Sequence, residues 1–233
     1  MSKIKKSDEG CVDITSVHEC GLIVETREIF LKSSSSSDDS SINHSTYERF
    51  ISNLRLLESI SSDPIVIHQF TIGGDWYAGM GIYDAILASK CNFVFVCYGI
   101  CASMGVVIAQ AVLNKGACVS LPNCEWLVHE GTTCISGTYK QLSSAYKEEQ
   151  IALDKFYNII VKSIKSRSER FCSEEESKIL RFIKKQLKDK EDWWMSPEDA
   201  KLFGFCDGVL GSNGFEDIES VIKSLNKNVF RAM

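Results

Sequence analysis

The chain has 233 residues, of which 44% are hydrophobic and 24% charged, so it holds enough apolar material for one α/β domain with a substantial core. Its net charge of -5 argues against a general nucleic-acid binder, because such proteins present a positive surface to the phosphates. The first residues lack the apolar stretch of a secretory signal, and the uncharged run 91–114 is interrupted by glycine and polar residues. We therefore expect neither secretion nor a membrane span.

Cysteine and histidine usage bears on the compartment and on metal binding. Ten cysteines lie mostly inside apolar segments, and none forms a CxxC pair. None of the four histidines is spaced to a cysteine pair as a zinc site requires. The pattern predicts free thiols in a reducing compartment, the cytoplasm, and no structural metal.

The N-terminal part of the chain alternates between polar and apolar segments. Residues 1–20 are polar and mixed, which predicts a flexible arm. The stretch 21–31 predicts one strand, and the serine-rich run 33–46 predicts a mobile loop. Apolar side chains recur at helical spacing over 47–60, which predicts an amphipathic helix. Because the helical pattern follows at once, we expect the loop to be an insertion within the domain.

A glycine pair follows the next buried strand. The strand at 64–70 leads through Gly73 and Gly74 into a predicted helix at 80–88, an order typical of a parallel sheet. The segment lacks the spacing of a nucleotide-binding loop, and Asp75 beside it would repel phosphate. The pair either forms a simple tight turn or lets the backbone approach an extended ligand with an N–H group pointing inward.

Ser103 lies at the centre of a second strand–turn–helix unit, between the apolar run 93–96 and a buried helix around 106–109. A hydroxyl at a helix start meets unpaired backbone N–H groups and the positive end of the helix dipole, which are the ingredients of an oxyanion hole. Serine is also a common helix N-cap. This stretch alone leaves a nucleophile and a structural cap both open.

A histidine and an aspartate further along could complete an acyl-transfer site. Two short strands are predicted over 118–129, and His129 ends the second of them. Asp192 precedes the apolar Trp193-Trp194. Each has an ordinary alternative, a polar residue at the core edge for the histidine and a surface residue for the aspartate. Because geometry and not chain order defines a triad, the set Ser103, His129 and Asp192 is a permitted one.

The C-terminal third is predicted to be mainly helical. A helix over 139–164 is long for a globular protein, and we expect it to project and to pack against a partner subunit. A second amphipathic helix is predicted over 173–190, with Ser173 and Glu176 as a capping box. The remaining predicted elements are a short helix started by Ser196-Pro197, a strand at 205–210 and a C-terminal helix and tail at 216–233.

Four motifs in this order resemble the family of Clp protease proteolytic subunits (ClpP): GGDWYAGMGIYDAI, GICASMGVVIAQA, LPNCEWLVHE and DWWMSPEDAKLFGFCDGVL. The resemblance covers roughly residues 21–215, which it marks as the protease domain. It implies an α/β fold, a ClpP/crotonase-like spiral core with a protruding handle helix. The handle and a helical extension would occupy 139–190.

The resemblance also implies a serine endopeptidase and a role for each site residue. Ser103 would be the nucleophile, His129 the general base and then acid, and Asp192 the residue that orients the imidazole. The backbone N–H groups of Gly74 and Met104 would form the oxyanion hole. No metal or cofactor is implied, and ATP would be used only by a partner.

The assembly implied by the resemblance is a homo-oligomer of two heptameric rings that stack through their handles around a chamber. Its partners would be an AAA+ unfoldase of the Clp type and unfolded polypeptide substrates. Neither nucleic acid nor a membrane would be involved.

The sequence departs from the family pattern at four places. Thr71-Ile72 stands where the family has Ser-Pro before the glycines, the serine-rich loop 33–46 is unusual, the interval from His129 to Asp192 is longer, and Glu130 follows the histidine. Three alternatives stay open: a catalytically silent ring subunit or scaffold, a crotonase-type acyl-CoA enzyme that uses the oxyanion amides without a triad, and a viral or phage-type processing protease with one client.

Overall fold

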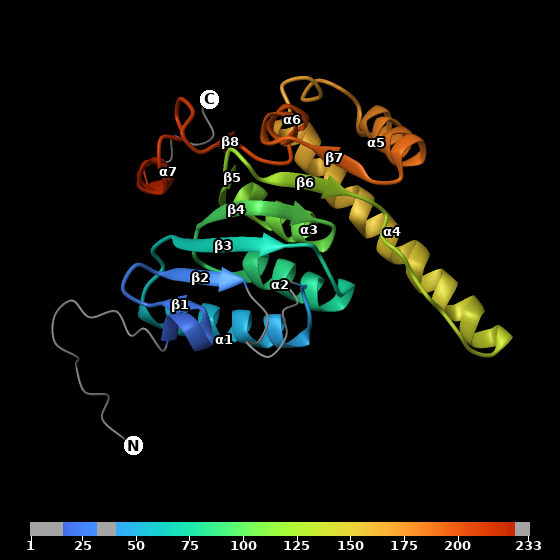
Figure 1. Cartoon of the computed structure of the whole chain (residues 1–233), viewed down its shortest axis with the longest axis horizontal. Coiled ribbons are helices and arrows are strands. Elements are labelled where there is room, and N and C mark those ends of the chain that lie inside the picture. Colours follow the sequence, from blue (N-terminus) through green and yellow to red (C-terminus); the bar gives the residue numbers. More distant parts are fainter. Residues whose placement is uncertain (1–15, 32–40, 227–233) are drawn as a thin grey trace, which may run out of the picture.

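The computed structural model describes residues 16–31 and 41–226, and an eight-stranded sheet forms its centre (Figure 1). The main path runs β1-β2-β3-β4-β5-β8, while β6 pairs with β4 and β7 pairs with β6. The pairs β1–β2 and β6–β7 are antiparallel and the others are parallel. The strands are β1 (Leu22–Ile23), β2 (Glu28–Leu31), β3 (Ile65–Thr71), β4 (Phe93–Ala102), β5 (Gly116–Ser120), β6 (Glu125–Val128), β7 (Trp193–Met195) and β8 (Gly208–Val209).

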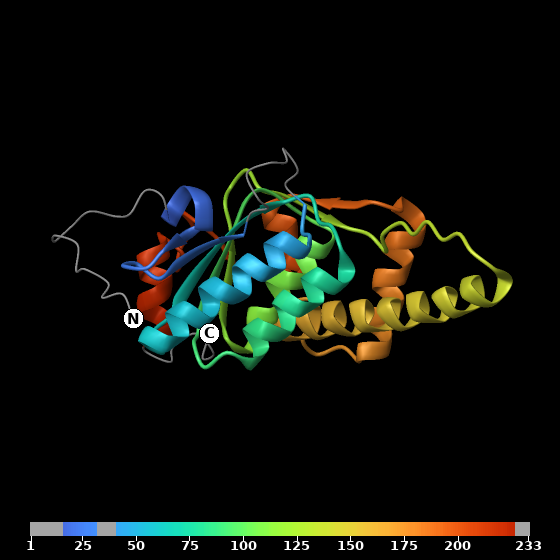
Figure 2. The ribbon, with the colours of Figure 1, turned by 90° about the horizontal axis from the view of Figure 1, so that it is seen from below.

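Helices cover both faces of this sheet, so the expected α/β architecture is confirmed (Figures 1 and 2). α1 and α2 run side by side along one face, and α7 covers part of the opposite face. The helices are α1 (His44–Ile60), α2 (Trp76–Ala88), α3 (Met104–Ala109), α4 (Tyr139–Arg167), α5 (Glu176–Lys190), α6 (Pro197–Phe203) and α7 (Ile218–Asn226), with a π-helical turn at Ser16–Cys20 and a 3-10 helix at Gln110–Asn114.

Strand β4 organises the core because it carries two hydrophobic faces and two neighbours on one edge. Phe93 and Phe95 point into the main core under α1, α2 and α3, whereas Val94 and Val96 join the smaller core under α7. The first half of β4 pairs with β5 and its last three residues pair with β6. The sheet therefore branches at the carboxyl end of β4, which brings β6 beside the residue that follows β4, with β7 paired to β6 in turn.

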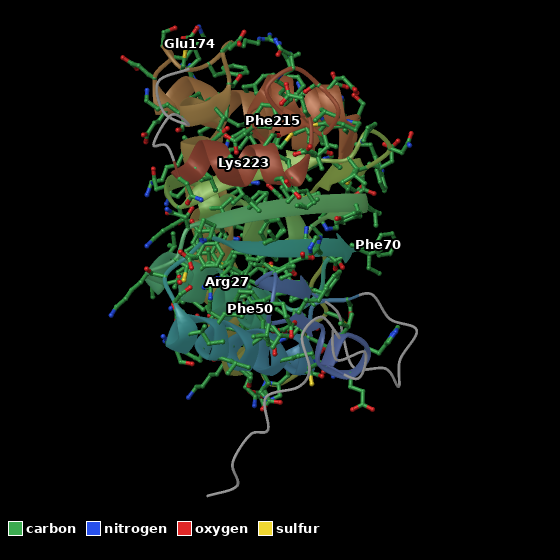
Figure 3. The ribbon with its side chains drawn as sticks, turned by 90° about the vertical axis from the view of Figure 1, so that its left-hand side faces the viewer. Arg27, Phe50, Phe70, Glu174, Phe215 and Lys223 are labelled. Atoms are coloured by element: carbon green, nitrogen blue, oxygen red, sulfur yellow. The ribbon has the colours of Figure 1, made fainter. Side chains whose placement is uncertain are left out.

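The predicted single strand at 21–31 is wrong, because the segment folds back on itself as the hairpin β1–β2. Arg27 turns the chain with a positive φ of 59°, and its guanidinium lies between the sheet and α1 (Figure 3). This guanidinium donates hydrogen bonds to the carbonyl oxygens of Leu57, Ser61 and Asp63 at 3.0–3.1 Å. The turn thus depends on contacts with a distant helix end, which no local pattern reveals.

Three helices begin at other residues than predicted, and side-chain caps explain two of them. α1 begins at His44 because Asn43 Oδ1 accepts a hydrogen bond from Thr46 N at 3.0 Å, so the predicted loop 33–46 extends too far. α2 begins at Trp76 and not at residue 80, because Asp75 Oδ1 accepts from Ala78 N at 2.7 Å. α5 begins at Glu176, and the predicted Ser173 capping box is wrong.

The predictions at the two ends of the chain also need adjustment. Residues 16–20 of the predicted arm form a π-helical turn, and Asn53 Nδ2 of α1 donates to Cys20 O at 2.8 Å. The predicted strand 205–210 is reduced to β8. Residues 1–15, 32–40 and 227–233 lie outside the described part, so the predicted arm, loop and tail stay predictions there.

Helix α4 is 29 residues long and divides into two unlike halves. Its C-terminal half packs into the core through residues such as Phe156, Ile160 and Ile164. Its N-terminal half, 139–155, contains no buried residue and projects beyond the body of the molecule in both views (Figures 1 and 2). Tyr139, Leu142, Tyr146 and Ile151 are exposed on this half. The helix therefore has an apolar surface that the rest of the described chain does not cover.

Arg167 fixes the C-terminal end of α4 to the sheet. Its side chain is 5% exposed, and its Nε lies 2.9 Å from Asp207 Oδ1. Asp207 Oδ2 accepts a hydrogen bond from Cys118 N at 2.7 Å, and Arg167 Nη1 donates to Gln110 Oε1 at 2.8 Å. One buried ion pair therefore joins α4, β5 and the segment before β8.

Candidate active site

Ser103 occupies a sharp turn between β4 and α3. Its backbone has φ 52° and ψ -120°, a conformation that L-residues rarely adopt, and its side chain makes no capping hydrogen bond. The turn is held because Ser103 N donates to Leu127 O of β6 at 2.8 Å, and Val106 N donates to Ser103 O at 3.0 Å. The structural-cap alternative is therefore wrong, and the strained turn presents the hydroxyl to a cavity.

The glycine pair lies directly against this serine. A Cβ at Gly73 would come within 2.5 Å of Ser103 Cβ, and Gly73 and Gly74 have φ of 108° and 142°. The Oγ1 atom of Thr71 accepts a hydrogen bond from Gly73 N at 3.1 Å and so stabilises the turn despite the unusual sequence before it. The backbone lies so close to Ser103 that only glycine fits at this position, whereas the predicted approach to an extended ligand stays a prediction.

Two backbone N–H groups beside Ser103 are available to a ligand. Other backbone groups of the glycine turn have hydrogen-bond partners: Ile42 N donates to Gly73 O, and Asp75 N donates to Ile42 O. Within the described chain, the N–H groups of Gly74 and Met104 donate no hydrogen bond to a protein group. Both residues line the same cavity as Ser103. Unpaired donors next to a hydroxyl can stabilise an oxyanion that forms there.

The register of β6 and β7 brings His129 opposite Asp192. Val128 of β6 pairs with Trp193 of antiparallel β7, so the residue after the first strand and the residue before the second face each other. His129 Nδ1 lies 3.2 Å from Asp192 Oδ1. The imidazole is 24% exposed and the carboxylate 52%, so solvent reaches this pair. The antiparallel pairing of β6 with β7 thus brings together two residues that are separated in the chain by α4 and α5.

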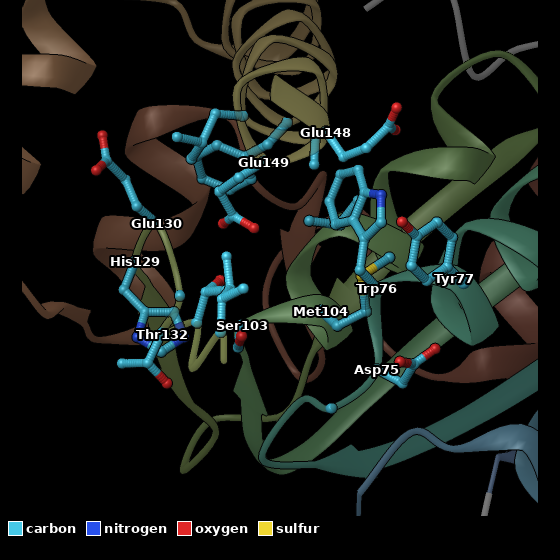
Figure 4. A pocket seen from close by; sticks show the side chains of 18 of the residues that line it. Asp75, Trp76, Tyr77, Ser103, Met104, His129, Glu130, Thr132, Glu148 and Glu149 are labelled. Carbon is cyan, nitrogen blue, oxygen red and sulfur yellow. The ribbon is translucent and has the colours of Figure 1, made fainter. Parts of the chain in front are cut away.

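A cavity of about 670 Å³ joins the candidate residues. Ser103 and His129 line one side of it, and Trp76 and Tyr77 line the other (Figure 4). In the described chain neither the Ser103 hydroxyl nor His129 Nε2 makes a hydrogen bond, so the two groups line the same cavity without a hydrogen bond between them. Catalytic hydrogen bonds are often long before substrate binds.

Comparison with known proteins gives the family. The Clp protease family model matches residues 15–213. The chain belongs to the Clp protease family. ATP-dependent Clp protease proteolytic subunits from Streptococcus pyogenes serotype M5 (strain Manfredo) and serotype M49 (strain NZ131) are each 28% identical over 149 residues, 64% of this chain and 69% of theirs. A solved ClpP1 point mutant from Listeria monocytogenes covers 85% of this chain and 96% of its own at 24% identity, with a TM-score of 0.64. The predicted ClpP-like fold is confirmed.

This Clp protease family member also has cavity residues that the sequence motifs did not indicate. Helix α4 contributes Glu148, Glu149, Leu153 and Phe156 to the wall. These residues reach the cavity because of the way α4 crosses the site, and helical periodicity alone does not predict that crossing.

Glu130, flagged in the sequence as an unusual neighbour of His129, accepts a hydrogen bond from Tyr157 OH of α4. Burial and then the Glu130 carboxylate raise the pKa of Tyr157 above its ordinary value. The bond ties the segment after β6 to the helix that passes over it. Glu130 is thus part of the support of the histidine segment in this Clp protease family member.

The cysteines of this family member do not offer a competing nucleophile in the cavity. The nine described cysteines are free, and burial raises the pKa of Cys101 to about 11 and that of Cys124 to about 12. Among the described residues no cluster of His, Cys, Asp and Glu could hold a metal ion, and no helix has the length and apolarity to cross a membrane. None of the residues that line the cavity is a cysteine.

Proposed function

We propose that this protein is a serine endopeptidase that hydrolyses peptide bonds of unfolded polypeptides inside an oligomeric chamber. The observation that carries the proposal is the convergence of three separate segments on one cavity. The β4–α3 turn brings Ser103, the β6–β7 register brings His129 with Asp192, and the glycine turn brings an unpaired N–H group. Family membership supports the same chemistry.

In the proposed mechanism Ser103 Oγ attacks the carbonyl carbon of the scissile bond while His129 Nε2 accepts the hydroxyl proton. Asp192 accepts the Nδ1–H bond and stabilises the imidazolium that forms. The carbonyl oxygen, now negative, receives hydrogen bonds from the Gly74 and Met104 N–H groups. His129 then gives the proton to the nitrogen of the leaving amine as the C–N bond breaks, which leaves an acyl ester on Ser103. In the second half of the reaction His129 accepts a proton from water as the water attacks this ester, and it returns the proton to Ser103 Oγ as the C–O bond breaks. No cofactor is needed.

We propose that the assembly consists of stacked rings with α4 between them. The support is the uncovered apolar half of α4 together with the family. In this proposal residues 21–215 form the protease domain, with the handle and helical extension at 139–190. An AAA+ unfoldase of the Clp type would supply substrates in a reducing compartment such as the cytoplasm. Native mass spectrometry with and without a candidate unfoldase would report ring size and partner together.

A fluorophosphonate probe tests the proposed nucleophile directly. Such a probe reacts with an activated serine hydroxyl, so we expect one labelled peptide, and we expect it to contain Ser103. The Ser103→Ala variant should remain unlabelled. A folded, assembled protein that stayed unlabelled would contradict the peptidase and favour a silent ring subunit. Labelling without peptide hydrolysis but with turnover of an acyl-CoA would favour the crotonase-type alternative.

Replacing Asp192 by asparagine is expected to lower kcat for a fluorogenic peptide by about 100-fold. Asparagine keeps the size of the side chain and removes the charge that stabilises the imidazolium. We expect a smaller loss than for a buried aspartate because the carboxylate is 52% exposed and therefore partly screened by water. The matched control is Asp189→Asn on the exposed face of α5, which should leave kcat unchanged. Equal activity of both variants would show that another group orients His129.

A further inference from the structure

The cavity around Ser103 combines apolar walls with negative charge. Met104, Val107, Leu153 and Phe156 contribute apolar surface, and Trp76 closes one side. Its lining also includes the carboxylates of Asp75, Glu130, Glu148 and Glu149, whereas none of the residues in this lining is a lysine or an arginine. A substrate bound in this cavity would contact apolar side chains and would experience the negative electrostatic potential of the carboxylates.

The four carboxylates are not equivalent. Asp75 caps α2, and Glu130 accepts the Tyr157 hydrogen bond. Glu148 is exposed and points toward the outer edge of the cavity (Figure 4). Glu149 is half-buried, and its carboxylate points from α4 into the cavity above Ser103 (Figure 4). Glu149 is therefore the carboxylate placed to meet a substrate side chain.

Glu149 makes no ion pair or hydrogen bond within the described chain. A partly desolvated carboxylate without a partner favours an incoming cation. The side chains of lysine and arginine match such a place because each has an apolar stem and a charged end. The stem would lie along Met104, Val107 and Leu153, and the charged end would reach Glu149 near the face of Trp76, which also attracts cations.

From this arrangement we propose that Glu149 gives the cavity a preference for peptides with a lysine or arginine side chain near the scissile bond. The inference rests on the proposed peptidase function and adds the chemical class of the substrate. Glu149 acts as a specificity-determining residue that binds the substrate side chain and takes no part in bond cleavage.

The test measures binding, so that it does not depend on turnover. The full chain with Ser103→Ala binds two fluorescent peptides that differ only in a central lysine or norleucine, and fluorescence anisotropy gives each Kd. Norleucine keeps the hydrocarbon stem and lacks the ammonium group. We expect about 10-fold or tighter binding of the lysine peptide, the range of one charge-assisted contact, and a smaller difference at high salt.

Adding Glu149→Gln should abolish the preference by weakening only the lysine peptide. The matched control is Asp154→Asn, which removes the same charge from an exposed position of α4 outside the cavity and should leave the ratio intact. Glu149→Lys should reverse the preference toward a peptide with a central glutamate. Circular dichroism of each variant verifies the fold.

Two outcomes overturn the inference: equal binding of the two peptides by the Ser103→Ala protein, or a preference that persists after Glu149→Gln. Labelling of the unsubstituted chain by the fluorophosphonate probe is measured separately. Absence of labelling contradicts the proposed function, whereas labelling together with equal binding of the two peptides contradicts only the role of Glu149.

Discussion

Replacing Ser103 by alanine is expected to lower kcat for peptide hydrolysis by about 10⁵-fold or more. Alanine keeps the Cβ atom that contacts Gly73 and the same backbone turn, so the loss reflects the missing hydroxyl. Without it the cavity retains the unpaired N–H groups of Gly74 and Met104, the proposed oxyanion donors, and these donors together with substrate binding should give only weak acceleration. Steady-state hydrolysis of a fluorogenic peptide by wild type and variant measures the effect.

His129→Ala should lower kcat nearly as much, and the double variant should be hardly slower than either single one, because the two groups act as a unit in the proposed mechanism. Ser144→Ala is the matched control, since Ser144 is exposed on α4 and lies outside the cavity lining. A Ser103→Ala protein that kept more than a hundredth of the wild-type rate would remove the serine mechanism. Strictly additive losses would show that Ser103 and His129 act separately.

Replacing Arg167 by methionine is expected to lower the free energy of unfolding by about 3–5 kcal/mol. Methionine keeps much of the apolar stem, so the change mainly removes the charge that faces Asp207. Asp207 would keep its bond from Cys118 N but lose its cation in a largely buried place. Urea unfolding followed by circular dichroism, at one fixed protein concentration, measures the difference.

Arg181→Met is the control for this prediction, because Arg181 is exposed on α5, and we expect a change within about 0.5 kcal/mol. Adding Asp207→Asn to Arg167→Met should restore part of the lost stability by removing the unpaired charge. A loss below about 1 kcal/mol for Arg167→Met would mean that water replaces the guanidinium without penalty.

The order of strands, turns and helices could be predicted because it follows from local periodicity. Ser103 stood out for the same reason, since an apolar strand and a small-residue helix flank it. The antiparallel contact that faces His129 with Asp192 could not be predicted in this way. It joins segments separated by the whole of α4 and α5, and only the resemblance to a known family suggested it.

The errors have physical causes of two kinds. The starts of α1 and α2 were missed because Asn43 and Asp75 sit in polar or glycine-rich surroundings that conceal a cap. The turn at Arg27 depends on another element, the end of α1. The position of Glu149, for which the sequence made no prediction, depends in the same way on how α4 crosses the cavity. Local pattern carries no information about such partners.

The left-handed backbone conformation of Ser103 means that one position cannot give both the most stable turn and a reactive hydroxyl. A residue with a Cβ in that conformation costs of order 1–3 kcal/mol, whereas glycine adopts it freely. Glycine, however, has no hydroxyl to react. The sequence that would make this turn most stable is therefore one that could not carry out the proposed chemistry, and the rest of the core must compensate for the difference.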